Sequence, residues 1–253
     1  MTEEPLITVS NLDMFIDKNH ILKNINLSIP KNKITVILGP SGCGKTSLLK
    51  CFNRLTDLYP EINITGEINI ENENILQKNI DVNLLRMKMG LLSQRPYPLP
   101  MSIKENIIFA LKLRGITKKA EQMLALEELL RQVNLWDEVK DRLHEPAAKL
   151  SVGQQQRLCL ARGLAIKPSI ILADEPTASL DPLSSRIIEE KFIALKKDYT
   201  IVLVTHILRQ ARRLADNVIF VYLGEIVEQG NAKDFFENPK MERSQSYLSG
   251  MFN

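Results

Sequence analysis

The stretch that decides the fold is Lys33-Ile34-Thr35-Val36-Ile37-Leu38, followed at once by Gly39-Pro40-Ser41-Gly42-Cys43-Gly44-Lys45-Thr46. The first part is an apolar run rich in β-branched residues, which predicts a buried strand. The second part is a glycine-rich loop, and the residues from Ser47 to Leu55 predict a helix after it. A strand, a glycine loop and a helix in this order indicate a parallel α/β core.

The glycine loop matches the pattern G-x-x-x-x-G-K-[ST] in the strand-to-helix context that this pattern requires. Glycines allow backbone N–H groups to converge on the phosphates of a nucleotide without a clash of side chains. Lys45 would direct its charge at the β- and γ-phosphates, and the Thr46 hydroxyl is suited to bind Mg²⁺. The residues that we expect to bind nucleotide here are Gly39, Pro40, Ser41, Gly42, Cys43, Gly44, Lys45, Thr46 and Ser47.

Two carboxylates follow a second apolar run, Ile170 to Ala173, which is typical of a buried parallel strand. Asp174 is suited to hold Mg²⁺ directly or through water, and Glu175 to orient and deprotonate an attacking water. A strand end that is acidic only because it reaches the surface is the alternative interpretation. The phosphate loop in the same chain favours the hydrolytic one.

Two further polar residues stand at the ends of apolar runs. His206 directly follows the strand predicted from Ile201 to Thr205. A histidine in such a place is more often structural, and a contact with the γ-phosphate is the functional alternative. Gln94 follows the apolar stretch Met89 to Ser93, where its amide can bind Mg²⁺ or water while a mobile segment begins. Taken alone, Gln94 would support no functional inference.

The stretch Leu150-Ser151-Val152-Gly153-Gln154-Gln155-Gln156-Arg157 predicts the start of a helix. Ser151 can cap the helix, and Gln154 completes a capping box three residues later. A helix N-terminus attracts phosphate through its free N–H groups and partial positive charge. An ordinary capped core helix is the simpler interpretation, since apolar residues follow at helical spacing: Leu158, Ala161, Leu164 and Ala165.

The chain has 253 residues, of which 44% are apolar, so a sizeable core is expected. A helical stretch lies between the two α/β blocks. Ser102 and Glu105 predict one capped helix in it, and Thr117 to Val133 predicts an amphipathic one. We therefore expect residues 96–164 to form an inserted helical subdomain within one domain, 1–253, whose α/β core and β-subdomain are 1–95 and 165–253. The expected buried stripe of the amphipathic helix is Ala120, Met123, Leu124 and Leu130.

Composition restricts the possible partners and compartments. The 33 basic and 30 acidic residues give a charge of 33 − 30 = +3, which argues neither for nor against nucleic acid. No long basic block appears, and nucleic acid is not among the expected partners. No apolar run approaches the roughly eighteen residues of a membrane span, and Met1 to Pro5 lacks a signal pattern. The three cysteines, Cys43, Cys51 and Cys159, lack metal-ligand spacing and fit a reducing cytosol. A membrane role would have to come through a partner.

These motifs, in this order, resemble those of the ATPase subunits of ABC transporters across essentially the whole chain: the phosphate loop, Gln94, the signature Leu150–Gln154, Asp174-Glu175, Ser179-Leu180-Asp181 and His206. The resemblance implies an α/β fold with a P-loop NTPase core, RecA-like and mostly parallel. It also implies an N-terminal antiparallel β-subdomain, an inserted helical subdomain, and ATP and Mg²⁺ as cofactors. Thr46, Gln94 and Asp174 would hold the metal, and Glu175, His206 and Gln94 would take part in hydrolysis.

The resemblance further implies that two copies pair head to tail. Each ATP would lie between the phosphate loop of one copy and the signature of the other, which comprises Ser151, Val152, Gly153 and Gln154. Ser151 and Gly153 would contact the γ-phosphate across the interface, and Asp181 would help to link the two sites. Closure and reopening of the dimer would drive membrane subunits that contact the helical subdomain and the segment after Gln94.

Four stretches carry a closer resemblance to the ATPase of bacterial phosphate importers of the Pst type: Cys51–Leu58, Ser93–Ile103, Gly153–Cys159 and the ending Tyr247–Phe252. That family implies uptake of inorganic phosphate through two transmembrane permease subunits and a phosphate-binding protein outside the membrane. The ATPase would then lie peripherally on the cytoplasmic face of the cell membrane. Alternatives are import of another solute such as amino acids, a soluble ABC protein acting on DNA or ribosomes, and a regulatory nucleotide binder without turnover.

The sequence departs from the family pattern at two places. In the family, an aromatic residue near the N-terminus usually stacks on adenine. The corresponding position here is Ile16, with Phe15 beside it, so one of these two residues would have to pack the base. Val152 replaces the usual first glycine of the signature. A β-branched residue at a helix start lowers helix stability by only about 0.5 kcal/mol, and the Val152 N–H group is retained.

Overall fold

The computed structural model describes residues 5–250, so Met1–Glu4 and the end of the Tyr247–Phe252 stretch lie outside the described residues. The chain forms two compact units. The first consists of residues Met1–Arg86 and Lys196–Asn253, and the second of Met87–Leu195.

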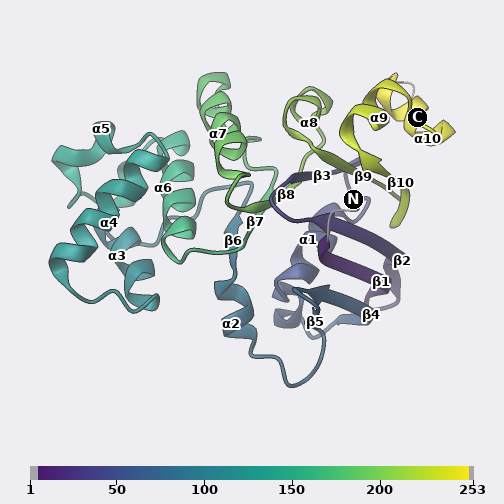
Figure 1. The fold of residues 1–253 in the computed structure, drawn as a ribbon, viewed down its shortest axis with the longest axis horizontal. Coiled ribbons are helices and arrows are strands. Elements are labelled where there is room, and N and C mark those ends of the chain that lie inside the picture. Colours follow the sequence, from purple (N-terminus) through teal and green to yellow (C-terminus); the bar gives the residue numbers. More distant parts are fainter. Residues whose placement is uncertain (1–4, 251–253) are drawn as a thin grey trace. The chain divides into compact units, whose positions relative to one another are not determined.

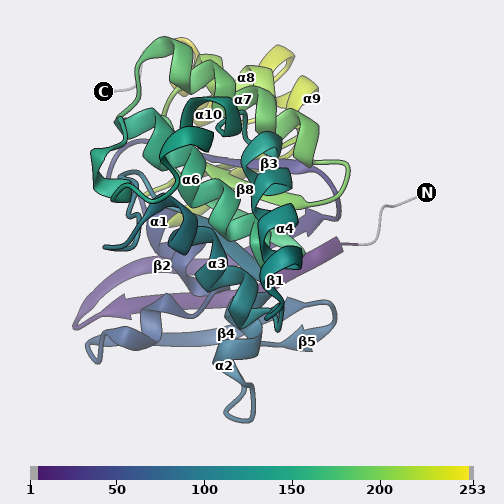
Figure 2. The same cartoon turned by 90° about the vertical axis from the view of Figure 1, so that its left-hand side faces the viewer.

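The first unit contains an antiparallel sheet with the strand order β2-β1-β4-β5 (Figure 2). Buried and more exposed residues alternate along β2, as expected for a sheet with one face against a core. The stretch Glu61 to Gln77 predicts a hairpin with its turn at Gly66. Strands β4 and β5 do form a hairpin, but they pair across Glu71 and Asn72, both of which have positive φ, and Gly66 lies inside β4. The strand bounds are β1 Pro5–Ile16, β2 Asn19–Pro30, β4 Ile62–Ile70 and β5 Glu73–Asn74.

The first unit also carries strands in the order β10-β9-β3-β8, in which β3 runs parallel to both neighbours and β10 is antiparallel to β9. Every residue of β3 and β8 is buried, as predicted for apolar runs in a parallel core. The sequence from Val218 to Val227 predicts a hairpin around Gly224, and β9 and β10 confirm it. The bounds are β3 Ile34–Leu38, β8 Thr200–Val204, β9 Asn217–Tyr222 and β10 Glu225–Asn231.

The helices of the first unit follow the strands of this second set. The phosphate-loop helix begins at Lys45 and ends at Phe52, slightly earlier than the predicted Ser47–Leu55, and a short 3-10 turn, Leu55–Leu58, follows it. The last segment, through Asn238-Pro239, predicts a short helical tail, and the structure forms two helices there. The bounds are α1 Lys45–Phe52, α8 Leu208–Leu214, α9 Ala232–Glu237 and α10 Glu242–Leu248, and α2, Val82–Met87, ends where the second unit begins.

The second unit contains the parallel pair β6 (Met89–Leu92) and β7 (Ile170–Asp174) and a group of helices. In Figure 1 the helices α3 to α6, drawn in teal, lie together. The capped helix predicted at Ser102 is confirmed, because both bonds of its capping box with Glu105 are present. The helix bounds are α3 Ile103–Leu113, α4 Lys119–Gln132, α5 Trp136–Val139, α6 Val152–Ala165 and α7 Pro182–Leu195, with 3-10 turns at Lys140–Arg142 and Ala147–Lys149.

The buried face of α4 differs from the predicted stripe. Leu124 is 74% exposed, and the buried residues of this helix are Gln122, Leu126 and Leu130. The polar Gln122 is buried because its amide donates to the Ile116 carbonyl oxygen at 2.8 Å, a local bond that hydrophobic spacing cannot indicate. The prediction for Leu130 was right, and the register of the stripe was wrong.

Among residues 5–250, no helix has both the length and the apolar character that crossing a membrane requires. The three cysteines carry free thiols and are buried. The described residues also contain no group of three or more His, Cys, Asp or Glu side chains arranged to hold a metal ion by themselves.

Candidate nucleotide site

The phosphate loop joins β3 to α1 and requires glycine at two of its turns. Gly39 has φ 152° and Gly44 has φ 102°, both in the region that favours glycine. A Cβ atom on Gly39 would collide with the Val221 carbonyl oxygen of β9, and one on Gly44 would lie 2.8 Å from Leu22 Cδ2 of β2. The loop is therefore held closely against both sheets of the first unit, with its backbone forming the surface.

The helix that follows this loop begins without a side-chain cap. Its N-cap residue is Gly44, and because glycine has no side chain, no side-chain oxygen at the N-cap accepts from the first N–H groups of α1. The Lys45 side chain is only 5% exposed, and its ammonium donates to the carbonyl oxygens of Gly39 at 2.9 Å and Pro40 at 2.7 Å. An uncapped helix start beside a buried ammonium, lined by glycine backbone, fits the phosphates of a nucleotide.

The C-terminal helix α10 contributes a residue to the surroundings of the loop that the sequence did not indicate. The Tyr247 ring stacks on Phe220 of β9 at a centroid distance of 4.7 Å, and Phe220 pairs with Leu38, the last residue before the loop. Burial raises the pKa of the Tyr247 phenol to about 12; the nearby Cys43 also raises it, and a hydrogen bond with the Gly39 backbone acts in the opposite direction. Burial likewise raises the pKa of the Cys43 thiol, although Lys45 opposes this rise.

His206 lies at the same end of the sheet as the phosphate loop. In the parallel register, Val204 is opposite Ile37. His206 comes two residues after Val204, and Gly39 comes two residues after Ile37. The Ile207 N–H donates to the Thr205 hydroxyl at 3.1 Å, which turns the chain at the end of β8. His206 is exposed at this edge, where ligands of parallel α/β sheets commonly bind.

The two candidates for packing adenine lie in the hairpin between β1 and β2. The Phe15 ring stacks on the His20 ring, with centroids 4.1 Å apart and planes 14° apart. His20 is held in turn by Asp13 at 2.7 Å, and the Asn24 N–H and His20 together lower the pKa of that carboxyl, which burial opposes. Ile16 pairs with Asn19 beside the turn. Of the two candidates, Phe15 therefore already belongs to a stacked pair of rings.

In the second unit, Asp174 ends β7 and Glu175 follows it in an uncommon backbone conformation. Glu175 has φ 43°, and its carbonyl oxygen accepts from the Ala178 N–H at 3.0 Å. A non-glycine residue in the left-handed region costs about 1–2 kcal/mol, so the surrounding contacts must enforce it. This conformation sets the direction of the chain immediately after β7.

Gln156 of α6 connects the two stretches that carry the predicted residues for water and metal. Its amide nitrogen donates to the Ser93 carbonyl oxygen and to the Pro176 carbonyl oxygen, each at 3.0 Å. These residues are direct neighbours of Gln94 and Glu175. The Gln156 side chain is fully buried, and so is its bond to Pro176, whereas its bond to Ser93 is partly buried. The sequence offered no signal for this contact, because three consecutive glutamines do not indicate which one points inward.

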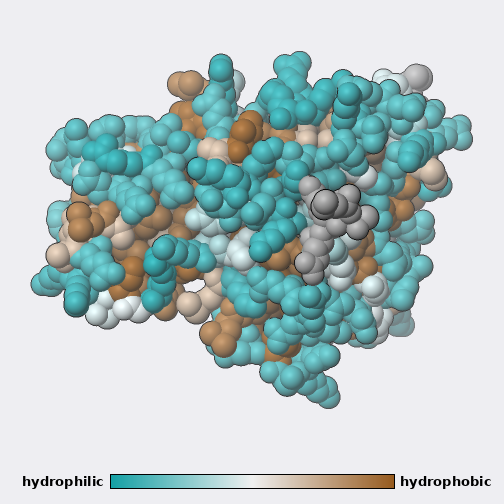
Figure 3. Space-filling view, in the orientation of Figure 1, coloured by the Kyte–Doolittle hydropathy of each residue, from teal (hydrophilic) through white to brown (hydrophobic). Residues whose placement is uncertain are grey.

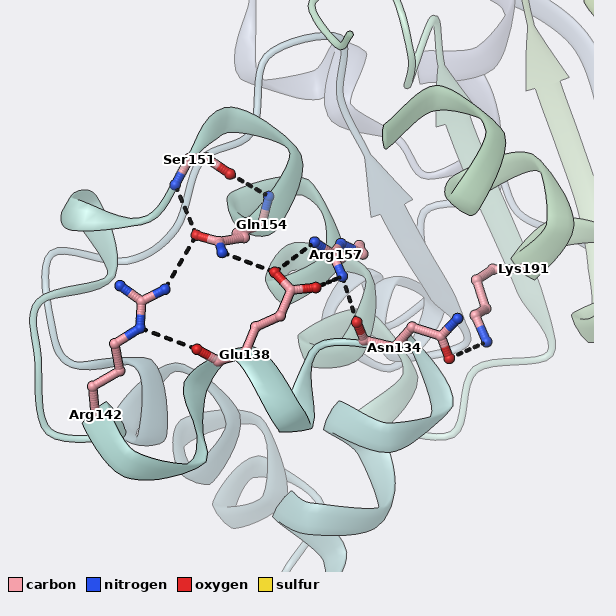
Figure 4. Close-up of polar contacts among 7 residues, drawn as sticks. All are labelled: Asn134, Glu138, Arg142, Ser151, Gln154, Arg157 and Lys191. Carbon is pink, nitrogen blue, oxygen red and sulfur yellow. Dashed lines mark hydrogen bonds and ion pairs between the residues drawn. The ribbon is translucent and has the colours of Figure 1, made fainter. Parts of the chain in front are cut away.

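The start of α6 has the capping box that the sequence predicts (Figure 4). The Ser151 hydroxyl accepts from the Gln154 N–H at 3.3 Å, and the Gln154 side-chain oxygen accepts from the Ser151 N–H at 3.0 Å. Ser151 and Val152 are exposed, Val152 by 45%, whereas Gly153 is buried. The apolar residues predicted to follow at helical spacing are all buried: Leu158, Ala161, Leu164 and Ala165.

Gly153 is buried because α7 passes directly beside it. A Cβ atom on Gly153 would lie 2.8 Å from Ser184 Cβ, so only glycine fits there without movement. Ser184 is also tied to Asp181, whose carboxylate accepts from the N–H groups of Leu183 and Ser184 at 3.0 Å each. The hydrogen bonds from Ser184 lower the pKa of the Asp181 carboxyl. The signature and the Asp181 turn are thus in contact through a single side chain.

Within each unit, residues that are far apart in the sequence come together. The first unit brings the phosphate loop, His206 and Tyr247 to one edge of β3 and its neighbours. The second brings the segments of Gln94 and Glu175 to α6 and sets the Asp181 turn against Gly153.

Solved structures of other proteins share this fold. One is cbiO1 from Clostridium perfringens, described as part of the ABC transporter complex cbiONQ, with a TM-score of 0.81 and 26% identity over 98% of each chain. Another is a bacterial Atm1-family ABC exporter with ATP bound, with a TM-score of 0.82 and 21% identity. The match covers 100% of this chain and 43% of the exporter, and at that identity it shows the fold alone.

The family model described as ABC transporter matches residues 22–178, which is more than half of the chain and includes the phosphate loop, Gln94, the signature and Asp174-Glu175. A domain of this family implies binding and hydrolysis of ATP. The chain therefore belongs to the ABC transporter family, as an ATP-binding subunit with the α/β fold of its ATPases.

Proposed function

We propose that this chain is the ATP-hydrolysing subunit of an importer of inorganic phosphate and that it works as a head-to-tail homodimer. One observation carries the dimeric mechanism. Helix α6 begins with an exposed Ser151, and its second turn holds the segments of Gln94 and Glu175 through Gln156. A single rigid helix would therefore connect the signature offered to the partner's ATP with the hydrolytic residues that act on the chain's own ATP.

Nucleotide binding rests on the first unit. The N–H groups at the uncapped start of α1 and the Lys45 ammonium would bind the β- and γ-phosphates in place of the Gly39 and Pro40 carbonyls that now accept from Lys45. Phe15 would pack the adenine through the outer face of its stacked pair with His20, and Ile16 would contribute apolar contact beside it. His206, at the edge of β8, would contact the γ-phosphate.

Hydrolysis rests on polar groups from both units, by the chemistry of each set and by the family resemblance. Thr46, Asp174 and Gln94 would hold Mg²⁺, which when bound neutralises charge on the phosphate oxygens. Glu175 would orient the attacking water and accept its proton. The positive φ of Glu175 and the tether at Pro176 would fix the direction of that carboxylate.

Coupling to a membrane partner is proposed for the helical subdomain, residues 96–164, beside the segment after Gln94. Several of its large apolar side chains are exposed, and Figure 3 shows hydrophobic patches over the region of α3 to α6. Exposed apolar patches with polar rims are typical of interaction sites. Two permease subunits would cover them and hold the ATPase peripherally at the cytoplasmic face, with a phosphate-binding protein on the other side. The exposed residues are Tyr97, Phe109, Leu113 and Leu124.

Substitution Glu175→Gln tests the hydrolytic mechanism. The amide keeps the shape of the side chain but cannot accept the proton of water, so we expect turnover to fall by about 100-fold or more while ATP binding is retained. ATP should then hold the variant as a closed dimer, which sedimentation would detect. Hydrolysis at the normal rate would overturn the assignment of Glu175.

The transported solute is tested separately, because no residue of the ATPase would touch it. The proposal of phosphate rests on the resemblance of four stretches to Pst-type ATPases. Uptake of labelled phosphate and of labelled amino acids should be compared between a strain that lacks this chain and one that expresses it. Restoration of amino-acid uptake alone would replace the proposed solute and leave the ATPase mechanism intact.

A further inference from the structure

A polar network behind the signature has no assigned role, and Glu138 is at its centre (Figure 4). Glu138 lies in the short helix α5, sixteen residues before Gln154. One of its carboxylate oxygens accepts from the Gln154 side-chain amide at 2.8 Å. The carboxylate also accepts two bonds from the Arg157 guanidinium, at 2.6 and 3.1 Å. Glu138 thus contacts α6 at two successive turns.

These contacts decide which way the Gln154 amide faces. Its nitrogen donates to Glu138, so its oxygen must face the Ser151 N–H, which donates to it at 3.0 Å. If the amide were reversed, its nitrogen would face the Ser151 N–H and its oxygen would face the carboxylate. Both contacts would then be repulsive. Arg142 adds a weaker contact to the same Gln154 oxygen at 3.5 Å.

The guanidinium keeps the Glu138 carboxylate charged and fixed in place. The Arg157 side chain is 6% exposed, and it also donates to the Asn134 carbonyl oxygen. Burial on its own would raise the pKa of the Glu138 carboxyl, but the hydrogen bonds from Arg157 and Gln154 outweigh it and the pKa is lowered. A bidentate pair of this kind is directional as well as attractive, so the carboxylate has little freedom to turn.

We propose that Glu138 is a positioning residue for the signature: it fixes the Gln154 amide, and through it the backbone and hydroxyl of Ser151, in the geometry that meets the γ-phosphate bound to the partner. This inference rests on the proposed head-to-tail function. The capping bond uses the Ser151 hydroxyl oxygen as an acceptor, so the hydroxyl hydrogen is available to donate to phosphate. Glu138 is not among the residues proposed to contact nucleotide, and it acts through Gln154.

The network also reaches the helix that follows Asp181. Lys191 of α7 donates to the Asn134 side-chain oxygen at 2.9 Å, and Asn134 has φ 54° at the turn between α4 and α5. Ser184, seven residues earlier on the same helix, packs on Gly153. Helix α7 therefore supports the signature from two points, directly at Gly153 and indirectly through Asn134 and Arg157.

The first experiment compares Glu138→Gln with Glu127→Gln. Both glutamates are 41% exposed, and both pair with an arginine, but Glu127 pairs with Arg131 of its own helix α4, one turn further along, and not with α6. The amide at 138 cannot accept from Arg157 and Gln154 together, so we expect kcat of ATP hydrolysis to fall about tenfold. ATP binding to the single chain should be unchanged. Glu127→Gln should alter neither quantity.

A heterodimer experiment distinguishes positioning of the signature from general damage. Chains that carry Lys45→Ala cannot use their own phosphate loop but still offer a signature to the partner. When a Lys45→Ala chain is paired with a Glu138→Gln chain, both defects fall in one shared site, and the other site is intact. We expect this pair to hydrolyse ATP clearly above the Lys45→Ala homodimer. A chain with both changes, paired with wild type, damages each site once and should hydrolyse ATP about tenfold more slowly than the first pair.

The same two pairings are made with Ser151→Ala in place of Glu138→Gln, as a positive control for a defect in the signature. If Ser151→Ala shows the expected pattern and Glu138→Gln does not, the inference about Glu138 is wrong and the shared-site function stands. If Ser151→Ala also fails to show it, the head-to-tail function itself is wrong, and the inference falls with it. Unfolding of the Glu138→Gln chain cannot imitate the expected result, because an unfolded partner would leave no intact site.

Discussion

Two helix starts in this chain are proposed to meet the phosphates of ATP, and they are built in opposite ways. Helix α1 begins at Gly44 in a left-handed conformation without a side-chain cap. Helix α6 begins at Ser151 with both bonds of a capping box in place. The first start leaves its N–H groups for a ligand, whereas the second satisfies its own groups from its own sequence.

This difference fits two different roles toward ATP. An uncapped start is costly without a ligand and so gains most from binding phosphate, which suits the site that holds ATP on the single chain. A capped start is stable by itself and offers one hydroxyl, which suits a surface that meets ATP only when the dimer closes. The support also differs: close packing against β2 and β9 shapes the first, and the polar contacts of Glu138 and Arg157 hold the second.

The largest expected effect is on the uncapped start. Lys45→Ala removes the buried ammonium that accompanies the first turn of α1, so we expect ATP affinity and hydrolysis each to fall by about 100-fold or more. Calorimetric titration with ATP and a phosphate-release assay would measure them. Lys50→Ala, in the last turn of the same helix, is the matched control. Tight binding by Lys45→Ala would mean that the α1 N–H groups suffice.

A smaller effect is expected at the capped start from Gly153→Ala. The new Cβ atom would lie 2.8 Å from Ser184 Cβ, so α6 and α7 must move apart. We expect hydrolysis to fall about tenfold, because a displacement of the order of an ångström is costly in a shared site. ATP binding by the single chain should not change, in contrast to Lys45→Ala.

A second change tests the cause of that loss. Ser184→Gly removes the atoms that Gly153→Ala would strike, so the double variant should recover part of the activity. The recovery will be incomplete, since glycine within a helix costs about 1 kcal/mol. No recovery in the double variant would show that the space beside Gly153 is not what α7 controls.

Ser151→Ala separates the capping role of this residue from its role toward phosphate. Loss of an N-cap costs about 1 kcal/mol in the free energy of unfolding. Ser102→Ala removes an equivalent capping box from α3 and should cost about the same, so it is the matched control. Urea denaturation and ATPase assays should therefore show equal losses of stability but a several-fold loss of activity only for Ser151→Ala. If Ser151→Ala and Ser102→Ala have equal ATPase activities, Ser151 acts only as a helix cap.

The smallest effect concerns Tyr247, which lies beside the uncapped start. Its pKa is raised from 10.0 to about 12, so the folded state holds the neutral phenol while the unfolded chain ionises. This contribution to stability is fully present below pH 10 and is lost as the pH rises to 12. Tyr247→Phe should therefore lose stability less steeply over that interval, as followed by denaturation at each pH. The exposed Tyr59→Phe should retain the wild-type slope.

The sequence determined what depends on neighbours along the chain. The glycine loop, its lysine and the strand before it predicted the nucleotide site, because φ preferences and the reach of one side chain are local properties. Both capping boxes were predicted for the same reason, since an N-cap and its partner are three residues apart. Hydrophobic runs likewise predicted the buried strands β3, β7 and β8.

The tertiary structure alone decided which distant groups support these sites. Periodicity could not show that Leu124 is exposed and Gln122 buried, because the burial of a helix face depends on what packs against it. Nor could periodicity predict which of the three consecutive glutamines is buried, that Glu138 contacts Gln154, or that Tyr247 lies beside the phosphate loop. Hydrogen bonds and stacked rings form between whichever groups the packed chain brings within a few ångströms, and that proximity is a property of the fold rather than of any one segment.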